Sequence, residues 1–261
     1  MKKALLKLLS AGMVLAMGLA VAGCSGSSDL TVKKGKLVMA TNAYFPPYEY
    51  HQGDNIVGID AEIADAVAKK LGLELEIMDV VFASIITGVQ SNKYDIGMAG
   101  MTVTEDRKLS VNFTDKYSTG IQAIIVKEDS PITDIDTLIN GDYIVGVQEG
   151  TTGDIYMADT PEKGGIGEAR VTRYSKGNDA VVALSVGKVD AVVIDNEPAK
   201  SFVEANEGLK ILETPYVEED YAICVNKNNT ELLNKINTAL KELTDDGTIP
   251  AIIEKYIPSK G

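Results

Sequence analysis

Apolar and polar positions along the chain predict short strands that alternate with amphipathic helices. KLVMAT (36–41) is an apolar run of strand length, and LELEI (73–77) alternates at the period of a half-buried strand. Between them, DAEIADAVAKKLG (60–72) has an apolar residue at every fourth position and ends at a glycine, as helices often do. FASIITGVQSN (82–92) is predicted as a second helix and YDIGMAG (94–100) as a third strand.

The same order of elements recurs further along, which indicates two α/β units in one chain. NDAVVALSVG (178–187) is predicted as the helix of the second unit. Because short strands that alternate with helices indicate parallel βαβ units, the predicted fold class is α/β with two lobes, each a mostly parallel sheet flanked by helices. The predicted strands of the second unit are YIVGVQ (143–148), ARVTRY (169–174) and DAVVID (190–195).

Two extended segments, near 117–126 and 216–225, connect the units. Helical patterns follow at 229–247, where Thr230 is the predicted N-cap, and at 248–258. If this C-terminal part packs on the first unit, the chain crosses between the lobes twice and forms a two-strand hinge. The predicted lobes are 35–119 with 221–261, and 120–220.

Candidate binding residues follow from the rule that open parallel sheets bind ligands at the carboxyl ends of their strands. One lobe offers the cation of Arg107 and the other the carboxylate of Asp195. A small zwitterion would satisfy both, since a guanidinium pairs bidentately with a carboxylate and an aspartate accepts from an ammonium. The residues predicted at strand ends are Thr41-Asn42, Ala99-Gly100 with Thr102, the turn 149–153, and Asp195-Asn196.

Each of these residues also has a purely structural interpretation. Arg107 could be a solvated helix residue, and Thr104 could cap a helix that begins at Glu105. Asp195 could cap the segment after it, and GTTG (150–153) is a turn in any context. Their joint placement at strand ends favours a binding site.

The N-terminus predicts export. Three lysines precede an apolar stretch (8–22) that is too short and too rich in glycine for a membrane span. It ends at VAGC (21–24), which resembles the lipobox of bacterial lipoproteins. We therefore expect a signal peptide at 1–23, lipid modification of Cys24, and a flexible tether at 24–34.

The net charge restricts the classes of binding partner, and the cysteine content restricts disulfide formation. The formal net charge is −13, and it becomes −16 without the three lysines of the signal peptide. Such an acidic body disfavours nucleic acid and anionic membranes as partners. Cys224 has no second cysteine to pair with in the mature chain, so we expect a small buried residue.

Signatures of catalysis are absent from the sequence. The one histidine, His51, has no recognisable acid and nucleophile around it, and no cluster has metal-ligand spacing. GTTG lacks the lysine of a phosphate-binding loop. We expect no enzyme, no cofactor and no metal, with a carboxylate pair acting as acid and base as the alternative.

Several stretches together resemble family 3 of the bacterial solute-binding proteins, the polar-amino-acid receptors of ABC importers. The resemblance runs from about Lys36 to Ile257 and implies a type II periplasmic-binding-protein fold that captures a free amino acid by closing its lobes. It also implies an ABC permease and its ATPase as partners, a monomer, and a lipid anchor on the outer face of the membrane. The stretches are TNAYFPPYEY, IVGIDAEIADAVAKKLG, AGMTVTEDR, VNFTDKY, VQEGTTGD and VDAVVIDN.

The resemblance assigns roles to individual residues. The ligand carboxylate would meet Arg107, Thr102 (hydroxyl or amide) and the Thr152 amide. Its ammonium would meet Asp195, the Gly100 carbonyl and the Thr102 hydroxyl, while two phenylalanines would enclose its side chain. The full predicted set is Asn42, Phe45, Phe82, Ala99, Gly100, Thr102, Arg107, Gln148, Thr151, Thr152 and Asp195.

Two departures from the family bear on the ligand. Asn42 stands where glutamine and basic-residue binders often carry an aspartate, and Gln148 where glutamine binders tend to have a lysine. A buried cation needs a charged partner, so these departures favour a neutral polar ligand, glutamine-like or sulfur-containing, slightly over a basic one. Glu49, Glu149 and Asp154 are the other carboxylates that could supply the charge. A sensory lipoprotein of the same fold, or a dehydratase-type enzyme, remains an alternative.

Overall fold

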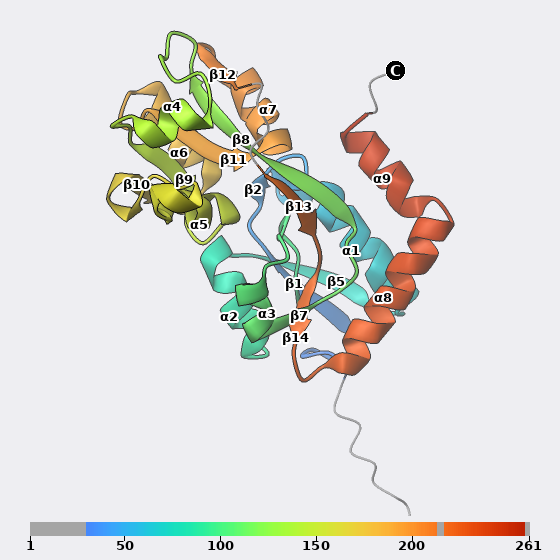
Figure 1. Cartoon of the computed structure of the whole chain (residues 1–261). Coiled ribbons are helices and arrows are strands. Elements are labelled where there is room, and N and C mark those ends of the chain that lie inside the picture. The colour runs from blue at the N-terminus through green and yellow to red at the C-terminus, as the bar shows by residue number, and fades with distance from the viewer. Residues whose placement is uncertain (1–29, 213–216, 259–261) are drawn as a thin grey trace, which may run out of the picture.

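The computed structural model describes residues 30–212 and 217–258, which form two sheets with helices around each (Figure 1). The predicted signal peptide, Cys24 and the tether as far as residue 29 lie outside the described residues, and so does residue 216 of the predicted hinge. Within the described ranges, no helix is long and apolar enough to cross a bilayer.

The first sheet has five strands from both ends of the chain. They are β1 (Lys36–Thr41), β5 (Glu74–Asp79), β6 (Ile96–Gly97), β7 (Val111–Phe113) and β14 (Cys224–Asn226). Their order is β5-β1-β6-β14-β7, with β1 parallel to both of its neighbours and β14 antiparallel to both of its own.

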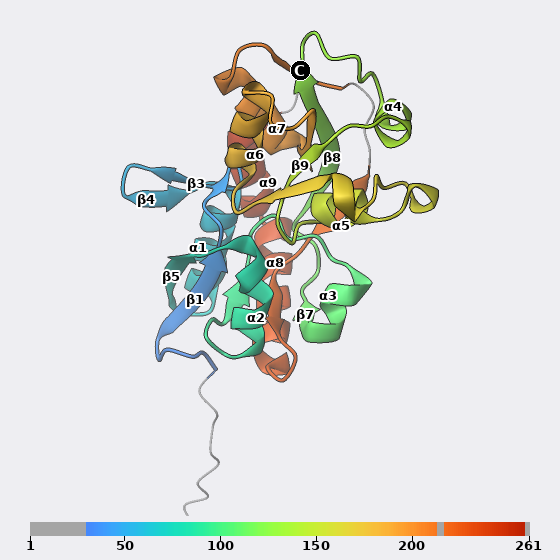
Figure 2. The ribbon, with the colours of Figure 1, turned by 90° about the vertical axis from the view of Figure 1, so that its left-hand side faces the viewer.

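Both faces of this sheet are covered by helices (Figures 1 and 2). Leu37 and Met39 of β1 belong to the apolar cluster that contains the first and last helices, whereas Val38 and Ala40 belong to the cluster on the opposite face. This period-two alternation explains why β1 reads as a continuous apolar run. The helices are α1 (Ile59–Lys70), α8 (Thr230–Asp245) and α9 (Thr248–Tyr256) on one side, and η1 (Phe82–Ser84), α2 (Ile85–Gln90) and α3 (Glu105–Ser110) on the other.

The second sheet repeats this design. Its strands are β8 (Ser118–Lys127), β9 (Val145–Gln148), β10 (Val171–Tyr174), β11 (Ala191–Asp195) and β12 (Leu209–Ile211), in the order β10-β9-β11-β8-β12. Around it lie α4 (Ile135–Asn140), α5 (Thr152–Ala158), η2 (Pro161–Lys163), η3 (Glu168–Arg170), α6 (Gly177–Ser185) and α7 (Asn196–Ala205). A small hairpin sheet projects from the first lobe. Its strands are β2 (Tyr44–Phe45), β3 (Glu49–Gln52) and β4 (Asn55–Val57).

Two strands run side by side between the sheets (Figure 1). β13 (Glu218–Tyr221) pairs antiparallel with the first half of β8, whose second half belongs to the second sheet, and β14 returns to the first sheet. The α/β class is as predicted, but each sheet is mixed, because β8 and β14 enter directly from a crossing segment and need no helical crossover. The exact lobe bounds stay a prediction.

Two local predictions differ from the structure. The strand expected at 94–100 pairs only at Ile96–Gly97, since the Asp95 carboxylate accepts the Val38 amide (2.7 Å) and Gly100 turns the backbone at φ +52°. Thr230 is not the cap of α8: the Asn229 side chain precedes it and accepts from the Leu232 amide (3.1 Å).

Candidate functional site

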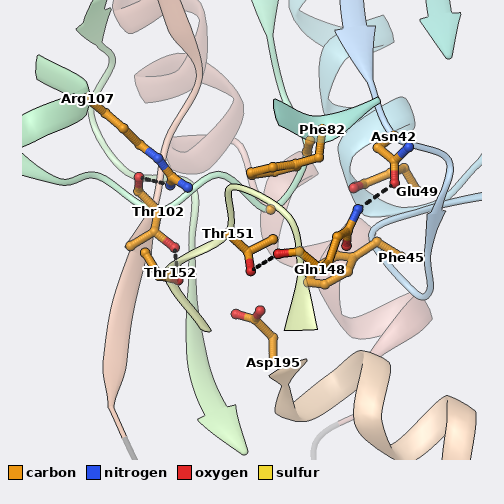
Figure 3. A pocket seen from close by; sticks show the side chains of 12 residues that line it. Asn42, Phe45, Glu49, Phe82, Thr102, Arg107, Gln148, Thr151, Thr152 and Asp195 are labelled. Atoms are coloured by element: carbon orange, nitrogen blue, oxygen red, sulfur yellow. Dashed lines mark hydrogen bonds between the residues drawn. The ribbon is translucent and has the colours of Figure 1, made fainter. Parts of the chain in front are cut away.

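One pocket between the two sheets collects every residue of the predicted binding set (Figure 3). The carboxyl ends of β1, β6, β9 and β11 lead into it, as expected for open α/β sheets. Glu49 is the additional lining residue that the predicted set did not include. The structure thus brings the predicted residues together, while their roles toward a ligand stay predictions.

The lobes touch each other across this pocket. Gln148 of the second lobe donates to Asn42 Oδ1 of the first (2.9 Å), and the Arg107 guanidinium donates to the Gly150 carbonyl (3.0 Å). At the rim, Lys176 Nζ lies 3.5 Å from the centre of the Tyr44 ring. These contacts describe a closed arrangement of the two sheets.

Arg107 supplies a buried positive charge. Its helix, α3, begins as predicted, with the Thr104 side chain accepting from the Arg107 amide. The side chain is only 7% exposed, donates to the Thr102 carbonyl (2.7 Å), and lies with its guanidinium 5.5 Å from the Phe82 ring centre. Burial lowers the pKa of this guanidinium, and no ion pair links it to a carboxylate of the described residues. A cation held on carbonyls and a ring face lacks a counter-ion, which a ligand carboxylate would provide.

Gly100 and the turn after β9 line the adjacent wall. Gly100 has φ +52°, and a Cβ there would lie 2.7 Å from the Phe45 ring, so a larger residue would displace the aromatic wall. Thr151 caps α5 by accepting from the Asp154 amide, and Thr152 opens that helix. The first amides of a helix have no intrahelical acceptor, so this end of α5 suits a carboxylate.

Asp195 supplies the buried negative charge. It ends β11, is 7% exposed, and accepts from the Tyr221 hydroxyl; it makes no side-chain cap for α7. Burial, reinforced by the negative charge of Glu219, raises the pKa of Asp195 to about 7. The carboxylate therefore lacks a cation, and a ligand ammonium would fill that role.

At the far end of the pocket, the amide nitrogens are already used. Asn42 Nδ2 donates to the Val80 carbonyl (2.7 Å), while Gln148 Nε2 donates to Asn42 and to the Ser175 carbonyl (3.3 Å). Glu49 lies beside these amides (Figure 3), is 1% exposed, and has no partner for its Oε2 atom. This end therefore offers oxygen acceptors and calls for a ligand group with donors.

Glu49 is the residue that the sequence motifs left undecided. Burial and the neighbouring Asp60 raise the pKa of Glu49 well above its ordinary value. The other two candidate carboxylates do not line the pocket, and Asp154 is occupied by Arg173 (2.8 Å) and by the Gly150 amide (2.9 Å). In the sequence, the signal for Glu49 was its place directly after the aromatic-Pro-Pro-aromatic stretch.

Comparison with known proteins places the chain among amino-acid-binding proteins. Residues 37–259 match the model of the bacterial extracellular solute-binding proteins, family 3. The arginine-binding extracellular protein ArtP of Bacillus subtilis is 36% identical over 98% of both chains. An ancestral arginine-binding protein solved with arginine is 39% identical with a TM-score of 0.79, covering 86% of this chain and 99% of the other. An ancestral arginine-binding protein solved with glutamine is 38% identical, with a TM-score of 0.79, over 87% of this chain and the whole of the other.

Proposed function

Because the chain belongs to family 3 of the bacterial extracellular solute-binding proteins, we propose that it captures a free L-α-amino acid with a cationic side chain, L-arginine first. The chain is an amino-acid-binding protein of an ABC transporter and not an enzyme. Its two-lobed α/β fold, the predicted type II class, is that of the solved amino-acid-binding proteins.

One observation carries the choice of a cationic ligand. The Glu49 carboxyl is buried, has a free oxygen, and faces a part of the pocket where the nearby amide nitrogens already donate to the protein. A guanidinium brings five donors to such a group and restores the charge that burial suppresses. The preference for a neutral ligand depended on Asn42 being uncharged, and in this proposal Glu49 supplies the charge from β3.

In this proposal the two ends of the ligand's backbone engage opposite charges. Arg107 and the Thr102 and Thr152 amides bind the α-carboxylate, while Asp195 and the Gly100 carbonyl bind the α-ammonium. Phe45 and Phe82 enclose the aliphatic part of the side chain. Contacts from both lobes are complete only when the lobes meet, so ligand binding favours the closed form.

Delivery completes the proposed role. A lipid on Cys24 would hold the monomer at the outer face of the membrane, extracellular or periplasmic, where the closed form would dock on an ABC permease driven by its ATPase. Sensing the same ligand is the alternative use of the same capture. Uptake of radiolabelled arginine by cells with and without the gene would separate transport from sensing.

L-Glutamine is the second candidate, because the Asn42–Gln148 amide pair suits a neutral side chain and an ancestral arginine-binding protein of the same fold was solved with glutamine. Its terminal amide would donate to Glu49, but its carbonyl would face acceptors. We therefore expect arginine to bind more tightly than glutamine.

Glu49→Gln should weaken L-arginine binding by about 10- to 100-fold, because a charge-assisted pair becomes a neutral hydrogen bond. L-Citrulline has nearly the shape of arginine without its charge, so its affinity should change little. Isothermal titration calorimetry of both ligands measures the ratio. Glu149→Gln, at an exposed carboxylate outside the pocket, is the matched control. An unchanged arginine-to-citrulline ratio in Glu49→Gln would exclude the proposed role of this carboxylate.

A further inference from the structure

A second buried carboxylate lies behind the pocket, on the crossing strand β13. Glu219 is 4% exposed and does not line the pocket. Its Oε2 atom accepts from Thr102 Oγ1 (3.0 Å), Thr152 Oγ1 (3.0 Å) and Gln122 Nε2 (2.9 Å). Its Oε1 atom accepts from the Tyr156 hydroxyl (2.9 Å). Four donors converge on this group, which suits a carboxylate with no proton to give.

These donors come from different parts of the fold. Thr102 follows β6 of the first sheet, Gln122 lies on β8, and Thr152 belongs to α5 beside the second sheet. Thr102 and Thr152 Oγ1 atoms lie 3.4 Å apart in this arrangement. Glu219 therefore joins residues of both lobes, and its full set of hydrogen bonds requires the lobes to be together.

The bonds to Glu219 also fix the direction of the threonine protons. A hydroxyl has one proton, so a hydroxyl that donates to a carboxylate can only accept from any further partner. The Thr102 hydroxyl consequently faces the pocket as an acceptor. An acceptor attracts an ammonium and repels a carboxylate, so the hydroxyl and the backbone amide of Thr102 cannot serve the same ligand group.

We infer that Glu219 is a positioning residue: it holds the Thr102 hydroxyl as an acceptor for the ligand's α-ammonium and ties it to Thr152 across the closed lobes. This inference rests on the proposed function, because it requires an α-amino ligand beside Asp195. The α-carboxylate is then left to Arg107 and to backbone amides. Glu219 thus directs the α-ammonium to the Thr102 hydroxyl, while the α-carboxylate binds Arg107 and the backbone amides.

The charges around the site agree with this division. Glu219 lies close enough to Asp195 for its negative charge to raise the pKa of that carboxyl, after the larger effect of burial. The carboxylates of Asp195 and Glu219 thus lie where the ligand's α-ammonium would bind, and the Arg107 guanidinium lies where its α-carboxylate would bind. A ligand ammonium would relieve the repulsion between the two carboxylates.

Glu219→Gln tests the inference, because the amide has the size of the carboxyl but brings donors toward the threonines. Rotating the Thr102 proton into the pocket should weaken L-arginine binding by about 10- to 100-fold. Binding of 5-guanidinopentanoate, which is arginine without its α-amino group, should change less than about threefold. Calorimetry or competition titration gives the ratio of the two affinities, which a general structural defect would leave unchanged. Glu218→Gln, at the exposed neighbour on β13, should alter neither ligand.

If Glu219→Gln does not fold, Thr102→Val removes the same acceptor and should show the same selective loss. An equal loss for both ligands, or no loss for arginine, would overturn the role of Glu219. Failure of the wild-type protein to bind arginine or any other α-amino acid would instead overturn the proposed function.

Discussion

Arg107→Ala should weaken binding of L-arginine by roughly 3–5 kcal/mol, a loss of about 10²- to 10⁴-fold, because it leaves the ligand carboxylate buried without its cation. Arg107 is 7% exposed, its guanidinium donates to two carbonyls, and no ion pair joins it to a carboxylate of the described residues. Calorimetric titration of the variant with L-arginine measures the change directly.

Two comparisons show whether the loss belongs to the carboxylate contact. Agmatine, which is arginine without its carboxylate, should bind the variant about as well as it binds the wild-type protein. Lys108→Ala removes the neighbouring cation on α3, whose partner is the surface residue Glu105 (2.8 Å), and should leave arginine binding unchanged. Wild-type-like arginine affinity in Arg107→Ala would contradict the assignment.

Asp195→Asn is expected to separate binding from stability. Affinity for α-amino ligands should fall by about 10²-fold, since the ammonium loses its charged acceptor in a buried site. The ligand-free variant should nevertheless melt at a higher temperature at pH 8, because the wild-type protein must keep a buried carboxylate ionised there. Asparagine keeps an acceptor for the Tyr221 hydroxyl, so the local packing is preserved.

The gain in stability from Asp195→Asn should depend on pH, because the pKa of Asp195 is raised in the folded protein. Asp195 titrates near 3.8 in the unfolded chain and at about 7 in the folded one, so between these values the folded protein holds the extra proton. The stability of the wild-type protein then declines as pH rises from about 4 to 7. The stabilisation by Asp195→Asn should grow over that window to roughly 2–4 kcal/mol and vanish below pH 4. Thermal unfolding from pH 4 to 8 measures it, with the exposed Asp179→Asn as control; a pH-independent difference would contradict the account.

Much of the architecture follows from periodicity in the sequence. Strands buried on both faces, such as β1 and β11, are continuous apolar runs, and their polar residues fall at the carboxyl ends where ligands bind. Arg107 could be assigned because a helix capped by Thr104 begins a few residues after the end of β6. Asp195 likewise stands at the carboxyl end of β11, which places it on the opposite wall of the pocket.

What the sequence left open depends on side-chain direction. Glu49 and Glu219 lie on short strands rich in polar residues, where period-two alternation does not say which carboxyl turns inward. Only the packing of the hairpin sheet against the first lobe turns Glu49 into the pocket, and only the pairing of β13 with β8 places Glu219 behind Thr102 and Thr152. The choice of ligand side chain therefore depends on the direction of Glu49, and the contact proposed for the α-ammonium depends on the direction of Glu219.

The central claim is that this pocket binds a free amino acid by its two charged backbone groups and a cationic side chain. Titration of the protein with L-arginine at pH 8, above the pKa of about 7 of Asp195, is the sharpest test of this binding mode. We expect one site that binds L-arginine with micromolar or tighter affinity, about 8 kcal/mol or more, and binds L-citrulline and L-glutamine more weakly. Undetectable binding of L-arginine, or equal affinity for arginine and citrulline, would contradict it.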